Sequence, residues 1–214
     1  IRPQNGAELV DVLNDLTPTS AGNLQFNGNG FFQSAVNLSG ANKLPNPVGF
    51  GNGTSATTGT FQGTQDIQFA GVVTSSDASN GVNVNGINVI FDSTFGLSGS
   101  TTARSFTIGG TGNLTVAGIV GNNGGATTGG AGSLVKNGSG TLTLQAANVF
   151  TGSLTINAGA LNAANIGTGA NQLGANVFNM GGGSLSSTKA DATASTQTYA
   201  SATLTANTSD RKST

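Results

Sequence analysis

From about residue 22 onward, hydrophobic and polar residues alternate in short runs, which is the pattern of half-buried β-strands. In NLQFNG, Leu24 and Phe26 fall on one face, and in DIQFAGVV the same holds for Ile67 and Phe69. Glycine or asparagine bounds these runs, as strand ends require. Further runs of this kind are INVIFD, SFTIGG, NLTVAGIV, TLTLQ and SLTINAG. The pattern predicts an all-β chain.

Residues 1–21 follow a different period. Apolar side chains recur there at helical spacing and acidic ones fall on the other face: Leu9, Val12, Leu13 and Leu16 against Glu8, Asp11 and Asp15. Asn5 is a candidate N-cap, and Pro18 would end the helix. We therefore expect a short helix within residues 1–21. It is either an ordinary surface helix or a cap over the open end of the strand region.

The strand starts recur at a nearly constant interval. Leu114, Leu134 and Leu154 succeed one another at an interval of 20, and so do Ile67 and Ile87. A coil of parallel strands explains such an interval, because each turn returns to the same face and stacks its apolar side chains on the previous turn. A sandwich of hairpins gives no reason for it. The spacing predicts a parallel β-helix, or β-solenoid, over residues 22–188.

Two segments interrupt the rhythm. Residues 43–63 contain Pro45, Pro47 and a Gly/Thr-rich run, which favours an irregular loop projecting from the rod. Residues 189–214 form a polar tail, in which TQTYASATLTA alternates well enough for one or two strands. We expect this tail to pack on the rod or, as Ser195–Thr214, to pair with a neighbouring chain.

Composition agrees with a narrow core and excludes several functions. Charged residues make up only 7% of the chain and hydrophobic ones 36%, with 35 glycines. The net charge is −1 and the basic residues are scattered, so no surface suits nucleic acid or an anionic membrane. Without cysteine there are no disulfides, and no apolar run is long enough to span a membrane. The opening IRPQNGAELV lacks Met and a signal segment, so we expect a processed product or a fragment.

The stretch from Gly132 to Leu161 carries a recognisable motif. GSLVKNGSGTLTL follows the pattern Gly-x-Leu-x-Lys-x-Gly-x-Gly-Thr-Leu-Thr-Leu. NVFTGSLTINAGAL then supplies Asn148, Phe150, Gly152, Thr155, Ile156, Gly159 and Leu161. This stretch resembles the passenger-associated repeat of bacterial autotransporters, the autotransporter-associated β-strand repeat. It departs from the usual pattern at Ala146 and Leu154, which affects turn shape or packing only.

The resemblance implies a right-handed β-helical stalk at the surface of a Gram-negative bacterium. It implies a secreted structural or adhesive passenger without catalytic activity. Its partners would be a receptor or glycan on a host or neighbouring cell, or further copies of itself. A complete precursor would also carry a C-terminal membrane barrel, and this chain would meet the membrane only through that missing part. The alternative is a self-assembling extracellular filament or sheath subunit, joined end to end or through tail strands.

The side-chain chemistry offers little for catalysis. The absence of His excludes a Ser–His–Asp triad and imidazole metal ligands. A polysaccharide-degrading enzyme is a third alternative, for which Asp66, Asp77 and Asp92 are the candidate carboxylates. With no Trp and only Tyr199, little could stack on a sugar ring. The Ca²⁺-binding repeat Gly-Gly-x-Gly-x-Asp does not occur. We therefore predict no catalytic, cofactor-binding or metal-binding residues.

Asparagine recurs at the ends of the predicted strands. These positions are Asn83, Asn85, Asn88, Asn148, Asn157, Asn162 and Asn165. Asparagine tolerates left-handed turns and can form side-chain ladders along a stack of strands. We expect these residues to shape corners rather than to bind a ligand.

Overall fold

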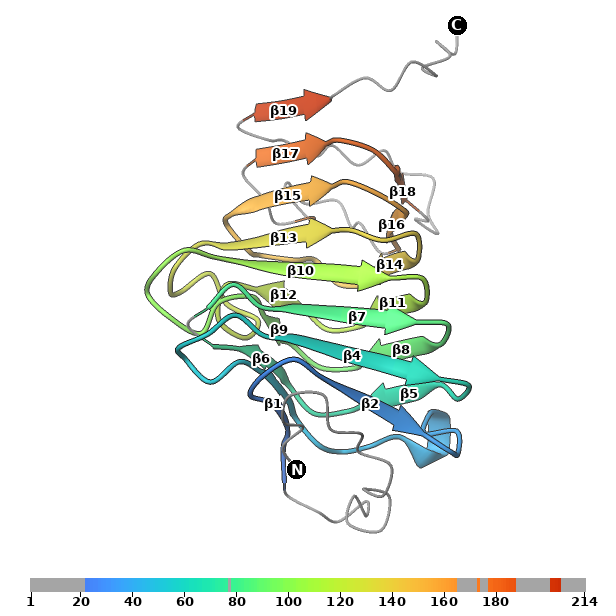
Figure 1. Cartoon of the computed structure of the whole chain (residues 1–214). Helices are drawn as coiled ribbons and strands as arrows, with labels where there is room; N and C mark the ends of the chain where they lie inside the picture. Colours follow the sequence, from blue (N-terminus) through green and yellow to red (C-terminus); the bar gives the residue numbers. More distant parts are fainter. Residues whose placement is uncertain (1–21, 77, 165–172, 174–176, 188–200, 205–214) are drawn as a thin grey trace, which may run out of the picture.

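A computed structural model of the chain describes residues 22–76, 78–164, 173, 177–187 and 201–204. Over these residues the chain coils through three parallel sheets, which confirms the predicted all-β parallel solenoid (Figure 1). The one helical element among them is a 3-10 turn, η1 (Gly40–Asn42). The helix predicted near the N-terminus falls within residues 1–21, outside the described residues.

Each sheet forms one wall of the coil, and every ladder within it is parallel. Sheet A contains β1 (Leu24–Phe26), β3 (Val48–Phe50), β6 (Val73–Ser75), β9 (Phe95–Gly96) and β12 (Val120–Gly121). Sheet B contains β2 (Gly30–Ser34), β4 (Thr58–Gly63), β7 (Gly81–Asn85), β10 (Arg104–Gly110), β13 (Gly132–Lys136), β15 (Ser153–Ile156), β17 (Val177–Met180) and β19 (Ser201–Leu204). Sheet C contains β5 (Ile67–Phe69), β8 (Asn88–Phe91), β11 (Asn113–Val116), β14 (Thr141–Leu144), β16 (Ala160–Ala163) and β18 (Ser184–Ser187).

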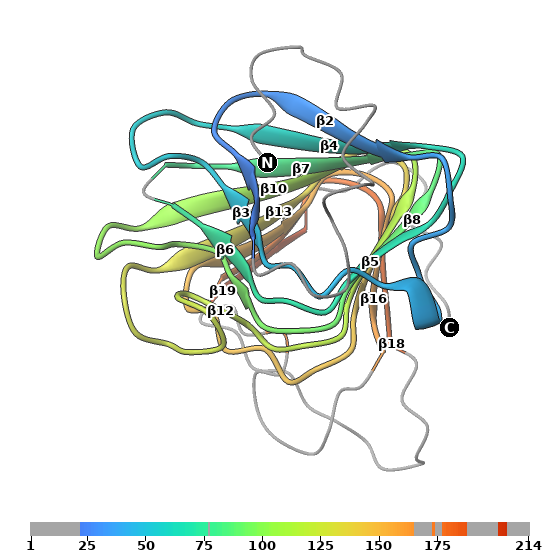
Figure 2. The same cartoon turned by 90° about the horizontal axis from the view of Figure 1, so that it is seen from below.

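The coil is right-handed. In Figure 1 the strands of sheet B run from left to right across the front, and those of sheet C return behind them as the chain climbs. Figure 2, seen from below, shows the three sheets surrounding a single core. The handedness agrees with the strong preference of parallel strand connections for a right-handed crossover.

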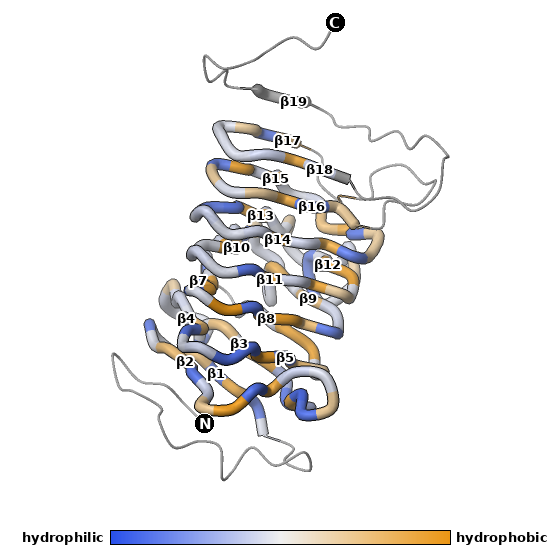
Figure 3. Tube along the Cα trace, turned by 90° about the vertical axis from the view of Figure 1, so that its right-hand side faces the viewer, coloured by the Kyte–Doolittle hydropathy of each residue, from blue (hydrophilic) through white to orange (hydrophobic). Residues whose placement is uncertain are grey.

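The core is filled by alternate residues of each strand. Leu24, Phe26, Ile67 and Phe69 are all fully buried, as the alternating pattern predicts. The colours in Figure 3 show the same alternation along the strands of sheet C. Inward side chains stack on those of the next turn because parallel strands keep the same residues opposite one another.

The constant interval predicted between strand starts is wrong for most of the coil. Leu134 does pair with Leu154, at the predicted interval, but Leu114 lies in sheet C and pairs with Leu142. Ile67 pairs with Val89 rather than with Ile87. Strands of sheets B and C carry the same alternation, so the sequence does not reveal which sheet a strand joins.

The interval varies because one of the three corners varies in length. Two to four residues connect sheet B to sheet C after β4, and three connect sheet C to sheet A at β5–β6, β8–β9 and β11–β12. The connections from sheet A to sheet B range from three residues, 27–29, to ten, 122–131. In Figure 2 these loops project together on one side. The number of residues between ladder partners on successive turns therefore differs from turn to turn.

Two interruptions of the rhythm take a definite form. Residues 43–63, predicted as an irregular loop, contain β3 and β4, so that prediction is wrong for these strands. Pro47 lies just before β3, where it interrupts no ladder hydrogen bond of the strand. In the tail, β19 pairs in parallel with β17 of the same chain. The rest of the tail lies outside the described residues.

Candidate functional site

The outer face of sheet A carries two parallel rows of outward positions. One row, just before the strands, is largely apolar and includes Val72 and Ile119, which are 43% and 37% exposed. The row beside it contains Gln25, Gly49 and Thr74, which are neighbours in the ladder, followed by Gly96 and Gly121. We call this second row the glycine row.

Each glycine of this row lies beneath another polar group. A β-carbon at Gly96 would lie 2.5 Å from the backbone nitrogen of Gly124, and one at Gly121 would lie 2.6 Å from that of Ala126. The loop of residues 122–126 therefore rests directly on the sheet. Glycine in a strand often marks such a close approach of another backbone.

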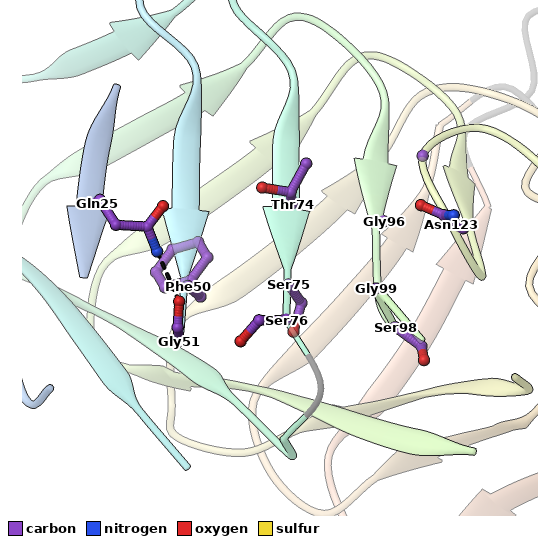
Figure 4. Close-up of a pocket in the computed structure, with 11 residues that line it drawn as sticks. Gln25, Phe50, Gly51, Thr74, Ser75, Ser76, Gly96, Ser98, Gly99 and Asn123 are labelled. Carbon is purple, nitrogen blue, oxygen red and sulfur yellow. Dashed lines mark hydrogen bonds between the residues drawn. The ribbon is translucent and has the colours of Figure 1, made fainter. Parts of the chain in front are cut away.

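At the other end of the row the covering group is a side chain. The amide of Gln25 lies across Gly49, with Nε2 2.9 Å from where a β-carbon would be. The same Nε2 donates a hydrogen bond of 2.7 Å to the carbonyl of Gly51. Figure 4 shows this bond at the edge of the face.

Between Gln25 and the loop 122–126 the face is hollowed by about 260 Å³ (Figure 4). The described residues around the hollow carry hydroxyl, amide and backbone groups without charge, among them Thr74, Ser76, Ser98 and Asn123. Such a lining can hydrogen-bond a neutral polar ligand. None of these groups is a general acid or base at neutral pH.

The carboxylates considered for catalysis do not form a pair. Asp66 precedes β5, and Asp92 follows the neighbouring strand β8. Ile67 is opposite Val89, so the two aspartates are about 13 Å apart along the sheet at about 3.3 Å per residue. Glycoside hydrolysis needs a separation of about 5–9.5 Å. Asp77, the third candidate, lies outside the described residues.

Asp66 instead begins a ladder of side chains along the edge of sheet C. Its carboxylate accepts hydrogen bonds from the backbone nitrogen and Nδ2 of Asn88, at 2.9 and 3.1 Å. Asn113 Nδ2 donates to Asn88 Oδ1 at 2.9 Å, and Asn113 Oδ1 accepts from the Thr141 backbone nitrogen at 3.1 Å. The ladder predicted for Asn88 is thereby confirmed, and it joins four successive turns.

Asp92 is held by two neighbours on the same face. Lys43 Nζ lies 2.7 Å from Asp92 Oδ2, and Gln68 Nε2 donates to Oδ1 at 2.7 Å. The lysine side chain is 43% exposed, so water screens this ion pair. Among the described residues, no three carboxylates come close enough to hold a metal ion. Both aspartates therefore connect turns of the coil.

Sequence reasoning missed a set of buried polar side chains at the corners. Asn122 is 1% exposed and uses its whole amide: Oδ1 accepts from the backbone nitrogens of Gly132 and Thr151, and Nδ2 donates to the carbonyl of Thr127. Asn80 is similarly buried and bonded to Thr57 and Phe50. Several of these partners lie one turn away, so no local signal marks the two asparagines as buried.

Lys136 is the one charged residue of the described core. It occupies the inward face of β13, between Ile108 and Ile156 of the neighbouring strands, and is 2% exposed. Its Nζ donates to the carbonyls of Asn137 and Gly138, at 2.7 and 2.9 Å. Burial lowers the pKa of this ammonium below its ordinary value.

Comparison with known proteins identifies this part of the coil. Residues 134–163 match the family described as the passenger-associated transport repeat. The match begins within β13, passes through β14 and β15, and ends with β16. Repeat and solenoid fit an autotransporter passenger domain. No curated protein and no solved structure matches the chain significantly.

Within the passenger repeat, polar residues of the motif hold the corners. Asn148 is 3% exposed, and its Oδ1 accepts from the backbone nitrogen of Val120 one turn earlier, at 2.8 Å. Asn157 Nδ2 donates to Asn137 Oδ1 at 2.8 Å, so the asparagines of the repeat do shape the stack. Over the described residues, no helix is long and apolar enough to cross a membrane.

Proposed function

We propose that the chain is part of the secreted passenger of a Gram-negative autotransporter and serves at the cell surface as a rigid structural or adhesive rod. The observation that carries this proposal is the passenger-associated transport repeat lying in register within a parallel solenoid. A solenoid offers long side faces, which suit many weak contacts acting together. The partner would be a receptor or glycan on another cell, or a further copy of the chain.

The positions of the acidic side chains support a rod without catalytic activity. The two aspartates that could serve a glycosidase are about 13 Å apart along the sheet. Each is occupied in bonds that connect turns. The described hollow on sheet A is lined by neutral groups.

A filament subunit is the second candidate, and the structure gives it less support. In that candidate, chains join end to end or through tail strands that pair with another chain. The tail strand β19 pairs with β17 of its own chain. Assembly through the ends of the coil would therefore have to use other edges.

The test is to display the chain on living cells. Residues 1–214 would be fused to the membrane-translocating domain of an unrelated autotransporter in a Gram-negative host. We expect the chain to become accessible to external protease and antibody, and the cells to adhere to epithelial layers or to one another. Retention of a folded chain inside the cell would contradict the passenger role, and display without any adhesion would contradict the adhesive role.

The chain offers a matched pair of controls on one strand. Leu142 points into the core and is fully buried, whereas its neighbour Thr143 points outward. Leu142→Asp should prevent the rod from forming at the surface, and Thr143→Asp should leave display unchanged. Purified protein would also be incubated with a panel of polysaccharides. Cleavage of any of them would contradict a purely structural role.

A further inference from the structure

We propose that the open part of the glycine row on sheet A binds an uncharged, glycine-containing peptide segment of a different protein. The site is the hollow between Gln25 and the loop of residues 122–126. It does not depend on how the chain is exported, so it can fail while the proposed function stands.

The chain itself shows what this surface accepts. Further along the same row, residues 122–126 fold back over Gly96 and Gly121. The loop is held as a tight turn, in which the Asn122 backbone nitrogen donates to the carbonyl of Ala126 at 2.8 Å. A peptide backbone is therefore the natural occupant of the row.

The surface also selects small residues in its occupant. A β-carbon at Gly125 would lie 2.9 Å from Thr94 Cγ2, so a larger residue there would collide with the apolar row. At Gly96 the nearest atom is the nitrogen of Gly124, so Gly96 must lack a side chain for the two backbones to approach this closely. At Gly124 a β-carbon would meet nothing within 4 Å, but φ is +56°, a left-handed conformation that favours glycine.

At the open end an amide already occupies the equivalent place. The Gln25 side chain ends in a primary amide, the side-chain counterpart of a peptide group, and lies over Gly49. It donates to the Gly51 carbonyl, as a peptide nitrogen could. Gln25 is half-buried and its side chain has several rotatable bonds, so an entering segment can displace it and take over its hydrogen bond.

The other residues around the hollow indicate which chemical groups the occupant should carry. Hydroxyl groups of Thr74 and Ser76 offer hydrogen bonds without charge. The exposed Val72 beside them offers apolar contact. A charged segment would lose hydration there without gaining an opposite charge. An uncharged segment of small residues fits best.

The experiment uses the cis segment as a probe. The peptide GNNGGAT, residues 121–127, would be titrated into the full-length, isotope-labelled chain while backbone amide signals are followed. We expect saturable shifts at Gln25, Gly49, Thr74 and Ser76. The peptide GNNVVAT, in which both central glycines become valine, should bind at least tenfold more weakly.

Two variants act on the site in opposite directions. Gln25→Ala removes the side chain that covers Gly49, so the affinity for GNNGGAT should rise several-fold. Gly49→Val places a side chain where the peptide would lie and should abolish the shifts of the backbone amide signals. Thr143→Val, on the outer face of sheet C, should leave these shifts unchanged.

Three results would overturn the proposal: no saturable shifts, equal binding of GNNVVAT, or weaker binding by the Gln25→Ala variant. If the chain self-associates and the Gly49→Val variant does not, the occupant would be a second copy of the chain. That result would overturn the assignment to a different protein. Because Gln25→Ala leaves the backbone free of new contacts, the test survives even if Gly49→Val fails to fold.

Discussion

The N-terminal turns and the passenger repeat are built on one fold but fill it differently. From β1 to β10 the core contains eight phenylalanines joined by ring contacts of 4.8–6.1 Å between centroids: Phe26, Phe32, Phe50, Phe61, Phe69, Phe91, Phe95 and Phe106. The core of the repeat is mainly aliphatic: Leu134, Leu142, Leu144, Leu154, Ile156 and Leu161, with Phe150 at one side.

The turn lengths follow the same division. The step from a core residue to its ladder partner is 22 residues from Phe69 to Phe91 and 29 from Phe32 to Phe61, but 19 from Leu142 of the repeat to Leu161. Large rings packed edge to face fill their part of the core, and aliphatic side chains stacked in register fill the other. The family match lies within the aliphatic part.

The corners differ as well. In the repeat, Gly138 has φ +73° and lies against the backbone of Gly110 from the previous turn. Gly86, at the equivalent corner of the N-terminal turns, has φ +74° and nothing within 4 Å of where a β-carbon would lie. Gly110, at the end of β10, lies against the backbone of Val84 in the same way, so tight stacking of this corner is not confined to the repeat but is absent at Gly86.

The largest expected effect is on the aromatic core. Phe61 contacts four rings, those of Phe26, Phe32, Phe69 and Phe91. Phe61→Ala should lower the free energy of unfolding by about 4–5 kcal/mol, because it creates a cavity and removes several ring contacts together. Leu142→Ala in the repeat should cost about 3 kcal/mol. Denaturant titration followed by circular dichroism would measure both, and an equal or larger cost for Leu142→Ala would break the comparison.

An intermediate effect separates the two kinds of corner. Gly138→Ala should destabilise the chain by about 3 kcal/mol, because a β-carbon would lie 2.5 Å from the Gly110 nitrogen and the conformation is left-handed. Gly86→Ala carries the same conformational cost without the collision, about 1 kcal/mol. Hydrogen exchange of the two variants would compare them directly. Equal costs would mean that the corner at Gly138 is no tighter than the corner at Gly86.

The smallest effect concerns the charge buried in the repeat. The folded-state pKa of Lys136 is lowered, so between that value and the unfolded one the unfolded chain binds more protons. The free energy of unfolding should therefore rise with pH across this alkaline window. Lys136→Met should remove that part of the slope.

Paired denaturant titrations of both proteins from pH 7 to pH 10.5 would measure the difference. The other titrating groups cancel in it, because the two proteins share them. A pH-independent difference would show that desolvation of Lys136 does not contribute.

The part of the fold that rests on local pattern could be predicted from the sequence. Alternation located the inward faces of β1, β5 and β14, and the motif around Gly132–Leu161 located the repeat. The ladder partner of each strand could not be predicted, because the connections from sheet A to sheet B vary in length and change the interval between partners. The strands β3 and β4 were hidden by Pro45, Pro47 and the glycines between them.

The site was less predictable still. The glycine row is visible only when β1, β3, β6, β9 and β12 are placed side by side, since successive members are a whole turn apart in the sequence. Lys136 reads as a surface residue in isolation, and its burial depends on carbonyl groups at a corner. The glycine row arises from contacts between turns, and Lys136 is buried between Ile108 and Ile156 of the neighbouring turns, which a single strand cannot encode.

The uneven corners give this rod one edge that is free to change. Two corners are short and nearly constant, so an insertion there would shift the strands beyond it. The connections from sheet A to sheet B already range from three to ten residues while the ladders on either side stay in register. New segments can therefore be gained, lost or grafted along that edge with little cost to the scaffold, and selection for recognition can act there separately from selection for folding.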